Sequence, residues 1–180
     1  MAAATIKRPS AGEYDTYYAR YIDVVPDGDV LDFLGREVQE TARLVGSLSE
    51  RDADFRYAEG KWSIKEVIGH ITDVERIMVY RALCFARGEP GALPGFDENE
   101  YVRRAKFASR RLADLVAELK AVRAATVLFF GTLDAEELER RGTANSRPYS
   151  VRALAFIVAG HERHHAKLLA DRYLPALGRR

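Results

Sequence analysis

The sequence predicts an all-α protein: a four-helix bundle with an extra short helix at the N-terminus. Two observations lead to this prediction. Apolar residues recur at spacings of three and four along four long segments, each opened by a capping residue, and almost no segment shows the alternation of a strand. Amphipathic helices of this length can hide their apolar faces only against each other, so an antiparallel bundle is the default arrangement.

The N-terminal segment, residues 1–28, carries Tyr14, Tyr17, Tyr18 and Tyr21. Its aromatic content suggests that it packs on the bundle as a short helix. The bundle is expected over residues 29–180 as one compact unit. A chain of 180 residues with 47% hydrophobic side chains can form one sizeable core, and no shift of composition divides it.

The first two bundle helices have clear starts. Asp29 is a plausible N-cap for a helix over roughly 30–48. Ser63, with Glu66 three residues on, is the pattern of a capping box that opens the second helix. Trp62 and Val67 are placed to form a hydrophobic staple around it. The apolar stripe of this helix is Ile64, Val67, Ile71, Val74, Met78, Ala82 and Phe85.

The third and fourth helices follow two breaks in the chain. Gly and Pro residues between 88 and 95 end the second helix, and Asp97 with Glu100 caps a long third helix whose stripe runs unbroken from Tyr101 to Phe129. The fourth helix begins near Ser150 and ends around Pro175. The connections 49–62 and 131–148 share an acidic short-helix pattern, which suggests a pseudo-repeat of two helix pairs.

Charge and composition exclude several classes of protein. The net charge is +1 and no basic block is interleaved with aromatics, so we expect no nucleic-acid partner, and we interpret Arg103, Arg104, Arg110 and Arg111 as a solvated helix face. No signal peptide and no apolar run of ~20 residues is present, which predicts a cytoplasmic protein without a membrane partner. The single Cys84 allows no internal disulfide and is interpreted as a core filler.

Three of the four histidines fall on apolar helical stripes. His161 and His165 are four residues apart, so both imidazoles face the same way on one helix, and His70 lies on the stripe of another. We expect these three to bind one divalent metal. Three neutral nitrogens suit zinc, and also nickel, iron or copper, with a position left open as in catalytic sites. The alternative is a structural protein whose buried histidines stay neutral and bind no metal.

Residues next to these histidines allow two interpretations each. Gly69 and Gly160 precede His70 and His161, and provide either close helix packing or clearance for a metal and its ligand. Asp73 and Glu162 orient imidazoles or act on a bound water, with Glu162 as the candidate catalytic residue, or they are surface carboxylates. His164 is out of register with the stripe and is expected at the bundle edge.

The string from His161 to His165 also spells the H-E-x-x-H pattern of zinc proteases, in which the Glu is the general base. Such proteases take a third ligand, usually downstream. The 15 residues after His165 contain neither His nor Glu, and Asp171 is turned away from the pair on the same helix. His70 is therefore the better third ligand.

The string KWSIKEVIGH, from Lys61 to His70, and the string HERHH, from His161 to His165, together resemble the DinB-like metal-binding four-helix bundles over residues 30–172. The resemblance implies an up-down-down-up bundle and a divalent metal, often zinc or nickel, at positions matching His70, His161 and His165. It also implies a homodimer. Some relatives activate a low-molecular-weight thiol such as mycothiol or bacillithiol for transfer or isomerisation, and others look like hydrolases.

The function expected first is a metal-dependent enzyme that activates a small thiol or water for transfer or hydrolysis of a small-molecule substrate. A metal-bound thiol loses its proton readily, so no catalytic Cys is needed. Trp62 or the N-terminal tyrosines are candidates for a wall of the substrate site. The alternative is a non-catalytic module that binds a metal or small ligand in the same pocket.

Overall fold

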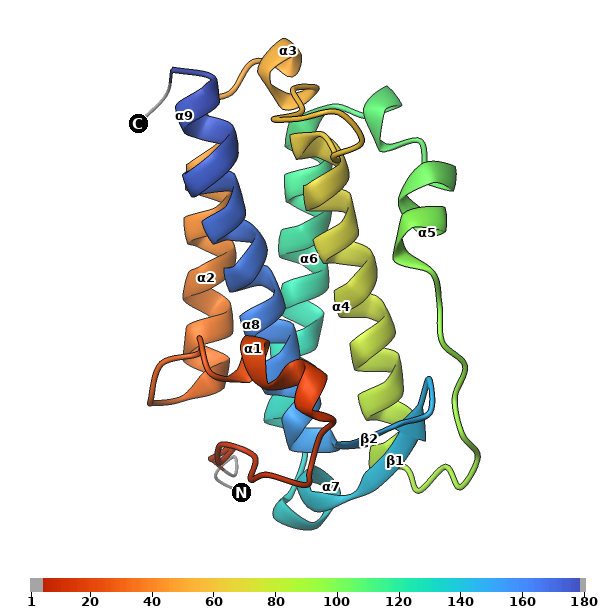
Figure 1. Ribbon diagram of the computed structural model, residues 1–180. Coiled ribbons are helices and arrows are strands. Elements are labelled where there is room, and N and C mark those ends of the chain that lie inside the picture. The colour runs from red at the N-terminus through yellow and green to blue at the C-terminus, as the bar shows by residue number, and fades with distance from the viewer. Residues whose placement is uncertain (1–4, 179–180) are drawn as a thin grey trace.

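A computed structural model describes residues 5–178 and shows the predicted bundle (Figure 1). Within these residues its four long helices are α2 (Val30–Val45), α4 (Ile64–Ala86), α6 (Leu112–Gly131) and α8 (Val151–Leu168). Helices α2 and α8 run in one direction and α4 and α6 in the other, so the order is up-down-down-up. The long segment between α4 and α6 climbs back along the outside of the bundle, which lets these two consecutive helices be parallel (Figure 1).

The predicted helix starts are confirmed by their hydrogen bonds. The Asp29 side chain accepts from the backbone N–H groups of Leu31 and Asp32, and Ser63 and Glu66 form the reciprocal capping box. Ser150 opens α8 by accepting from Ala153 N–H. Each side chain satisfies donors that the first helical turn leaves unpaired, so short polar residues at these positions fix where the helices begin.

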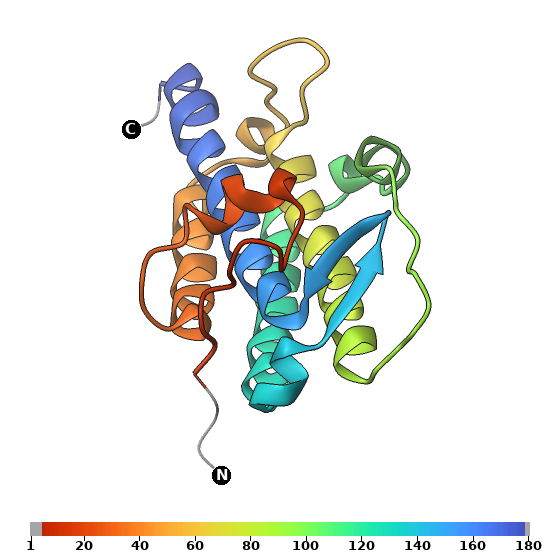
Figure 2. The same cartoon turned by 60° about the horizontal axis from the view of Figure 1, so that its bottom comes forward.

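The N-terminal segment forms the expected short helix. It consists of a 3₁₀ turn, η1 (Thr16–Tyr18), and α1 (Ala19–Ile22), and it lies across α8 (Figure 2). A Cβ on Gly160 of α8 would lie 1.8 Å from the carbonyl oxygen of Tyr21. Gly160 is therefore there for close packing. Gly69 plays the same part on α4, where a Cβ would lie 2.5 Å from the ring of Phe107.

The prediction of one long third helix from residue 97 is wrong for the first part of this segment. The structure has α5 (Glu98–Arg104), capped by Asp97 as expected, then a 3₁₀ turn, η2 (Phe107–Ser109), and only then α6. Lys106 adopts a left-handed conformation with φ 53°, which ends α5. This turn places Phe107 in the core against Gly69 and leaves Tyr101, Ala105 and Ala108 exposed, contrary to the predicted stripe.

A β-hairpin stands where no strand was predicted. Strands β1 (Arg141–Ala144) and β2 (Arg147–Ser150) pair antiparallel through a two-residue turn at Asn145 and Ser146, which have φ of 50° and 59°. Positive φ at both turn residues is the I′ geometry that matches strand twist. The hairpin is bordered by Leu93 on one side and Tyr14 on the other. It thereby holds two connecting segments against the end of the bundle.

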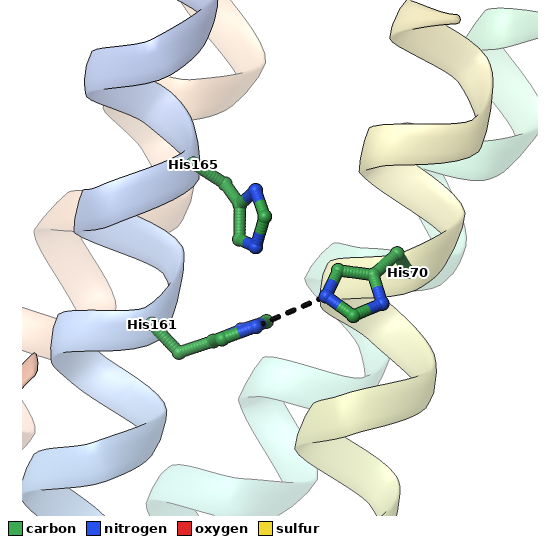
Figure 3. Close-up of side chains that lie close together, drawn as sticks. All are labelled: His70, His161 and His165. Carbon is green, nitrogen blue, oxygen red and sulfur yellow. Dashed lines mark hydrogen bonds between the residues drawn. The ribbon is translucent and has the colours of Figure 1, made fainter. Parts of the chain in front are cut away.

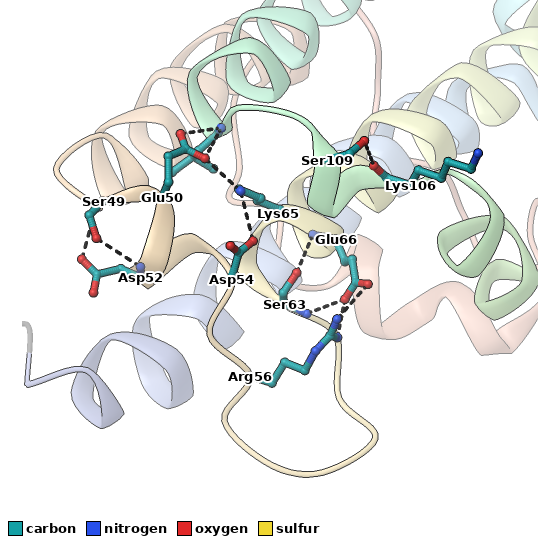
Figure 4. Close-up of polar contacts among 11 residues, drawn as sticks. Ser49, Glu50, Asp52, Asp54, Arg56, Ser63, Lys65, Glu66, Lys106 and Ser109 are labelled. Atoms are coloured by element: carbon teal, nitrogen blue, oxygen red, sulfur yellow. Dashed lines mark hydrogen bonds and ion pairs between the residues drawn. The ribbon is translucent and has the colours of Figure 1, made fainter.

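The connections 49–62 and 131–148 each contain the expected short acidic helix, α3 (Glu50–Ala53) and α7 (Ala135–Glu139). In the first, Lys65 of α4 pairs with Glu50 at 2.9 Å and with Asp54 at 3.0 Å (Figure 4). Glu50 also accepts the backbone N–H of Leu112, which opens α6 and has no cap of its own. One carboxylate of α3 therefore ties together the starts of α4 and α6.

The last helix continues beyond α8. A π-helical stretch over Leu169–Tyr173 leads into α9 (Leu174–Ala176), and Gly178 follows with φ 70°. Cys84 is half-buried and packs against the core, as expected of a filler. No helix in residues 5–178 is both long and apolar enough to cross a membrane.

Candidate metal centre

The structure brings the three predicted ligands together. His70 projects from α4 toward His161 and His165, which project from adjacent turns of α8 (Figure 3). All three are buried, with 3%, 6% and 8% of their surface exposed. The Nε2 atoms of His70 and His161 are 3.1 Å apart, and one nitrogen from each of the three rings lies within 4.8 Å of the others.

Burial keeps these imidazoles neutral. It lowers the pKa of His70 to about 4. The pKa values of His161 and His165 also lie well below the usual range, first because of burial and then because neighbouring imidazoles disfavour a positive charge. A neutral imidazole has one ring nitrogen with a free lone pair, which is the form that binds metals. The cluster is thus held in its ligating form at neutral pH.

The geometry fits a bound cation. Two nitrogens that share a tetrahedral zinc at about 2.0–2.1 Å lie about 3.3 Å apart, close to the separation seen between His70 and His161. Nδ1 of His165 is buried and has no hydrogen-bond partner among the described residues.

Aromatic rings enclose the cluster. The indole of Trp62 lies against His70, with ring centroids 4.5 Å apart, and the ring of Tyr21 meets His161 edge-on at 5.4 Å. His164 is exposed and contacts Tyr21 at 5.6 Å, which confirms its expected place at the bundle edge. Bulk water is therefore excluded from the imidazoles on the sides that Trp62 and Tyr21 cover.

A cavity of about 190 Å³ reaches the cluster at His161. Its walls come from the N-terminal helix, α4, the segment after it, the hairpin and α8. The lining residues are Tyr17, Tyr18, Tyr21, Val74, Met78, Arg81, Phe96, Glu98, Asn145, Arg147, Ile157 and His161. Of the two candidates for a wall of the substrate site, the N-terminal tyrosines line this cavity and Trp62 does not.

The sequence model of the DinB superfamily matches residues 34–169, which include all three histidines. The chain belongs to the DinB superfamily. Its fold is also that of YfiT from Bacillus subtilis, described as a probable metal-dependent hydrolase with an unusual four-helix bundle topology. The two structures align with a TM-score of 0.77 over 97% of this chain and 95% of that one, at 14% sequence identity. A search of curated proteins found no match.

Glu162 of this DinB protein has a different environment from the one expected. It is fully buried, so it is not a surface carboxylate, and its Oε2 lies 2.6 Å from Nη1 of Arg123 on α6. Burial raises its pKa. Arg123 also pairs through both carboxylate oxygens with Glu75 of α4, at 2.9 and 2.8 Å. No contact of the described residues joins Glu162 to the three imidazoles, and its catalytic role stays a prediction.

The buried Arg123 and Glu75 were missed by the sequence analysis, although the pattern holds a signal for both. Arg123 follows Leu119 by four and precedes Thr126 by three, and Glu75 follows Ile71 by four, so each stands on its stripe at apolar spacing. A buried cation and buried anions on facing helices are expected to pair. Asp73, the other candidate, is half-buried and lies 3.6 Å from Arg76.

Proposed function

We propose that His70, His161 and His165 hold a divalent metal, zinc or nickel, in an enzyme that activates a small thiol or water for transfer or hydrolysis. The observation that carries the proposal is the cavity at His161. It reaches His161, one of three buried ligands whose nitrogens lie within 4.8 Å of one another, and three protein ligands leave a position open for an exogenous group. A structural site needs no such access. The description of YfiT as a probable metal-dependent hydrolase points the same way.

The chain's own residues prepare the site for this chemistry. When bound, the metal lowers the pKa of a coordinated thiol or water and polarises a substrate. The two ligands on α8 are one turn apart and the third comes from α4, so helix packing fixes the ligand geometry. Arg123, which pairs with Glu75 of α4 and Glu162 of α8, holds these two helices in place through α6. We therefore assign Glu162 a positioning role in this proposal.

A non-catalytic binding module is the second candidate. The observation that favours it is the contact between Glu162 and Arg123, because the carboxylate that would serve as general base in the H-E-x-x-H pattern is already paired. The homodimer that the resemblance implies stays a prediction, which light scattering on the purified protein will test.

The metal is tested first, by elemental analysis of the protein as isolated and after exchange with zinc or nickel. We expect a stoichiometric divalent metal in the wild type and its loss in His70→Ala and His161→Ala. His164→Ala is the matched control, because this histidine is on the same helix but exposed, and it should keep the metal. A wild-type protein that holds no metal under either condition overturns the proposal.

Catalysis is tested with metal-loaded protein. Hydrolysis of simple esters and amides and thiol transfer to a panel of electrophiles are measured for the wild type, His161→Ala and His164→Ala. A rate that is lost only in His161→Ala supports the enzyme. A metal-loaded protein without turnover on either panel contradicts the enzyme and favours the binding module.

A further inference from the structure

Arg81 of α4 is a buried cation without a carboxylate partner. Only 2% of its surface is exposed, and it forms no ion pair with any described residue. Its Nη2 donates to the carbonyl oxygen of Pro94 at 3.0 Å, and its Nη1 lies 3.7 Å from the sulfur of Met78. Arg123, equally buried, meets two carboxylates. The guanidinium carbon of Arg81 lies 5.9 Å from the ring centre of Phe96 and 5.8 Å from that of Tyr149. Aromatic faces therefore offset part of its charge, but no carboxylate of the described residues pairs with it, although buried charges are normally paired.

Arg81 lines the same cavity as His161, and it also borders a second cavity beside Pro94 and Phe96. The hydroxyl of Tyr18, also in the wall, accepts a hydrogen bond from Tyr149 at 2.7 Å and so keeps its own proton to donate. The second arginine of the wall, Arg147, is already neutralised by Asp15 at 2.8 Å. The cavity thus has one buried positive charge, a hydroxyl donor and a histidine of the candidate metal centre.

We propose that this cavity binds the carboxylate of a small organic acid, with Arg81 as its anchor and the rest of the molecule extending toward His161. The planar guanidinium presents paired N–H groups that match a carboxylate. A single cation without a carboxylate partner suits a singly charged group. Glu98 in the wall and Asp15, which is paired with Arg147, are acidic and disfavour a doubly charged phosphate. The inference rests on the proposed function in making this acid the substrate.

The test compares benzoate with benzamide, two probes of similar shape that differ in charge. Binding of each is followed by NMR titration of the chelator-treated full chain, so that neither probe is held by a metal. We expect benzoate to bind about tenfold more tightly than benzamide, the gain typical of a hydrogen bond to a charged group. The shifted amides should include those of cavity residues such as Tyr18, Arg81 and Arg147.

Three variants assign the preference to Arg81. In Arg81→Met the two probes should bind equally. In Arg81→Lys a reduced preference for benzoate should remain, because lysine keeps the positive charge but lacks the paired N–H groups of the guanidinium. Arg76→Met, on the same helix at an exposed ion pair with Glu118, should keep the wild-type preference. If Arg81 only anchored the segment at Pro94, its loss would lower thermal stability without changing the ratio of the two affinities.

Several outcomes overturn the proposal: equal binding of benzoate and benzamide by the wild type, shifted amides confined to other regions, or an unchanged preference in Arg81→Met. If Arg81→Met does not fold, a wild-type preference for benzoate in folded Arg81→Lys contradicts the claim that the paired N–H groups of Arg81 bind the carboxylate. Because the chelator-treated protein is used, a carboxylate preference in a chain that binds no metal leaves this site standing while the proposed function fails. Conversely, metal binding by a chain that does not prefer benzoate supports the proposed function and contradicts this carboxylate site.

Discussion

The indole of Trp62 packs on the imidazole of His70, with ring centroids 4.5 Å apart. Trp62 is the single tryptophan of the chain, and it precedes the Ser63 cap of the helix that carries His70. Its fluorescence therefore reports on one place in the molecule, the candidate metal centre.

Cobalt or copper added to the chelator-treated protein should quench this fluorescence, because a paramagnetic ion held by His70 lies next to the indole. A fluorescence titration of the wild type and His161→Ala measures the effect. The Trp62 fluorescence of His161→Ala should remain unquenched at metal concentrations that saturate the wild type. The fluorescence of His164→Ala should be quenched as in the wild type. Equal quenching of wild type and His161→Ala would show that the ion binds elsewhere.

Arg123 and Glu162 should differ in their effect on stability. Arg123→Met leaves Glu75 and Glu162 buried without a cation and should lower the free energy of unfolding by roughly 3–5 kcal/mol. Glu162→Gln leaves the pair with Glu75 intact and should cost about 1 kcal/mol. Urea unfolding at neutral pH measures both. A cost of Glu162→Gln equal to that of Arg123→Met would contradict this prediction, because it would mean that the remaining pair of Arg123 with Glu75 adds no stability.

Gly160 and Gly69 form a second contrasting pair. Gly160→Ala places a methyl group against the backbone of Tyr21, which cannot move without displacing the N-terminal helix, and should cost about 3 kcal/mol, the upper end for overpacking. The atoms nearest to a Cβ on Gly69 belong to the side chain of Phe107, which can shift more easily than backbone, so Gly69→Ala should cost about 1 kcal/mol. Urea unfolding gives the energies. Faster hydrogen exchange in residues 5–28 of Gly160→Ala alone would confirm the cause, and unchanged exchange there would contradict it.

Glu13 should make stability depend on acid pH. Its hydrogen bonds to Arg152 lower its pKa from 4.5 to about 2. The folded-state pKa is below the unfolded one, so the stabilisation is complete above pH 4.5 and is lost as the pH falls toward 2. At neutral pH, Glu13→Gln should therefore be less stable than the wild type by roughly 2–3 kcal/mol. Urea unfolding from neutral pH down to about pH 3 should show this difference narrowing.

The control for this prediction is Glu139→Gln. Glu139 lies 3.6 Å from the same arginine but its side chain is 69% exposed, so its pair with Arg152 is screened and its loss should change stability little. A difference between Glu13→Gln and wild type that stays constant with pH would show that the Glu13 carboxylate is not stabilised in the folded state.

The sequence predicted the parts of the molecule that follow from local rules. Asp29, Ser63 and Ser150 were identified as caps because only a few side chains can pair the first N–H groups of a helix. His70, His161 and His165 were assigned to one cluster because each lies on an apolar stripe, and stripes face the interior. In both cases the residue and its immediate neighbours carry the information.

The parts that were missed depend on partners far away in the chain. The stripe from Tyr101 to Phe129 has the same spacing on both sides of the break at Lys106, so periodicity alone cannot detect it. The break is fixed by Phe107 packing on Gly69 and by Glu50 capping Leu112. The hairpin turn at Asn145 and Ser146 lacks the glycine that makes such turns recognisable. Arg81 becomes notable only when the structure shows that it pairs with no carboxylate of the described residues.

The up-down-down-up order of the bundle bears on when the site can form during synthesis. His70 leaves the ribosome long before His161 and His165, and until α8 docks beside α4 a nascent chain presents a lone imidazole, which holds a cation weakly. Under the proposed function, tight loading would therefore await docking of the fourth helix, and capture of the ion and closure of the hydrophobic interior would be one event. A chain arrested before α8 would be expected to compete poorly for metal in the cell.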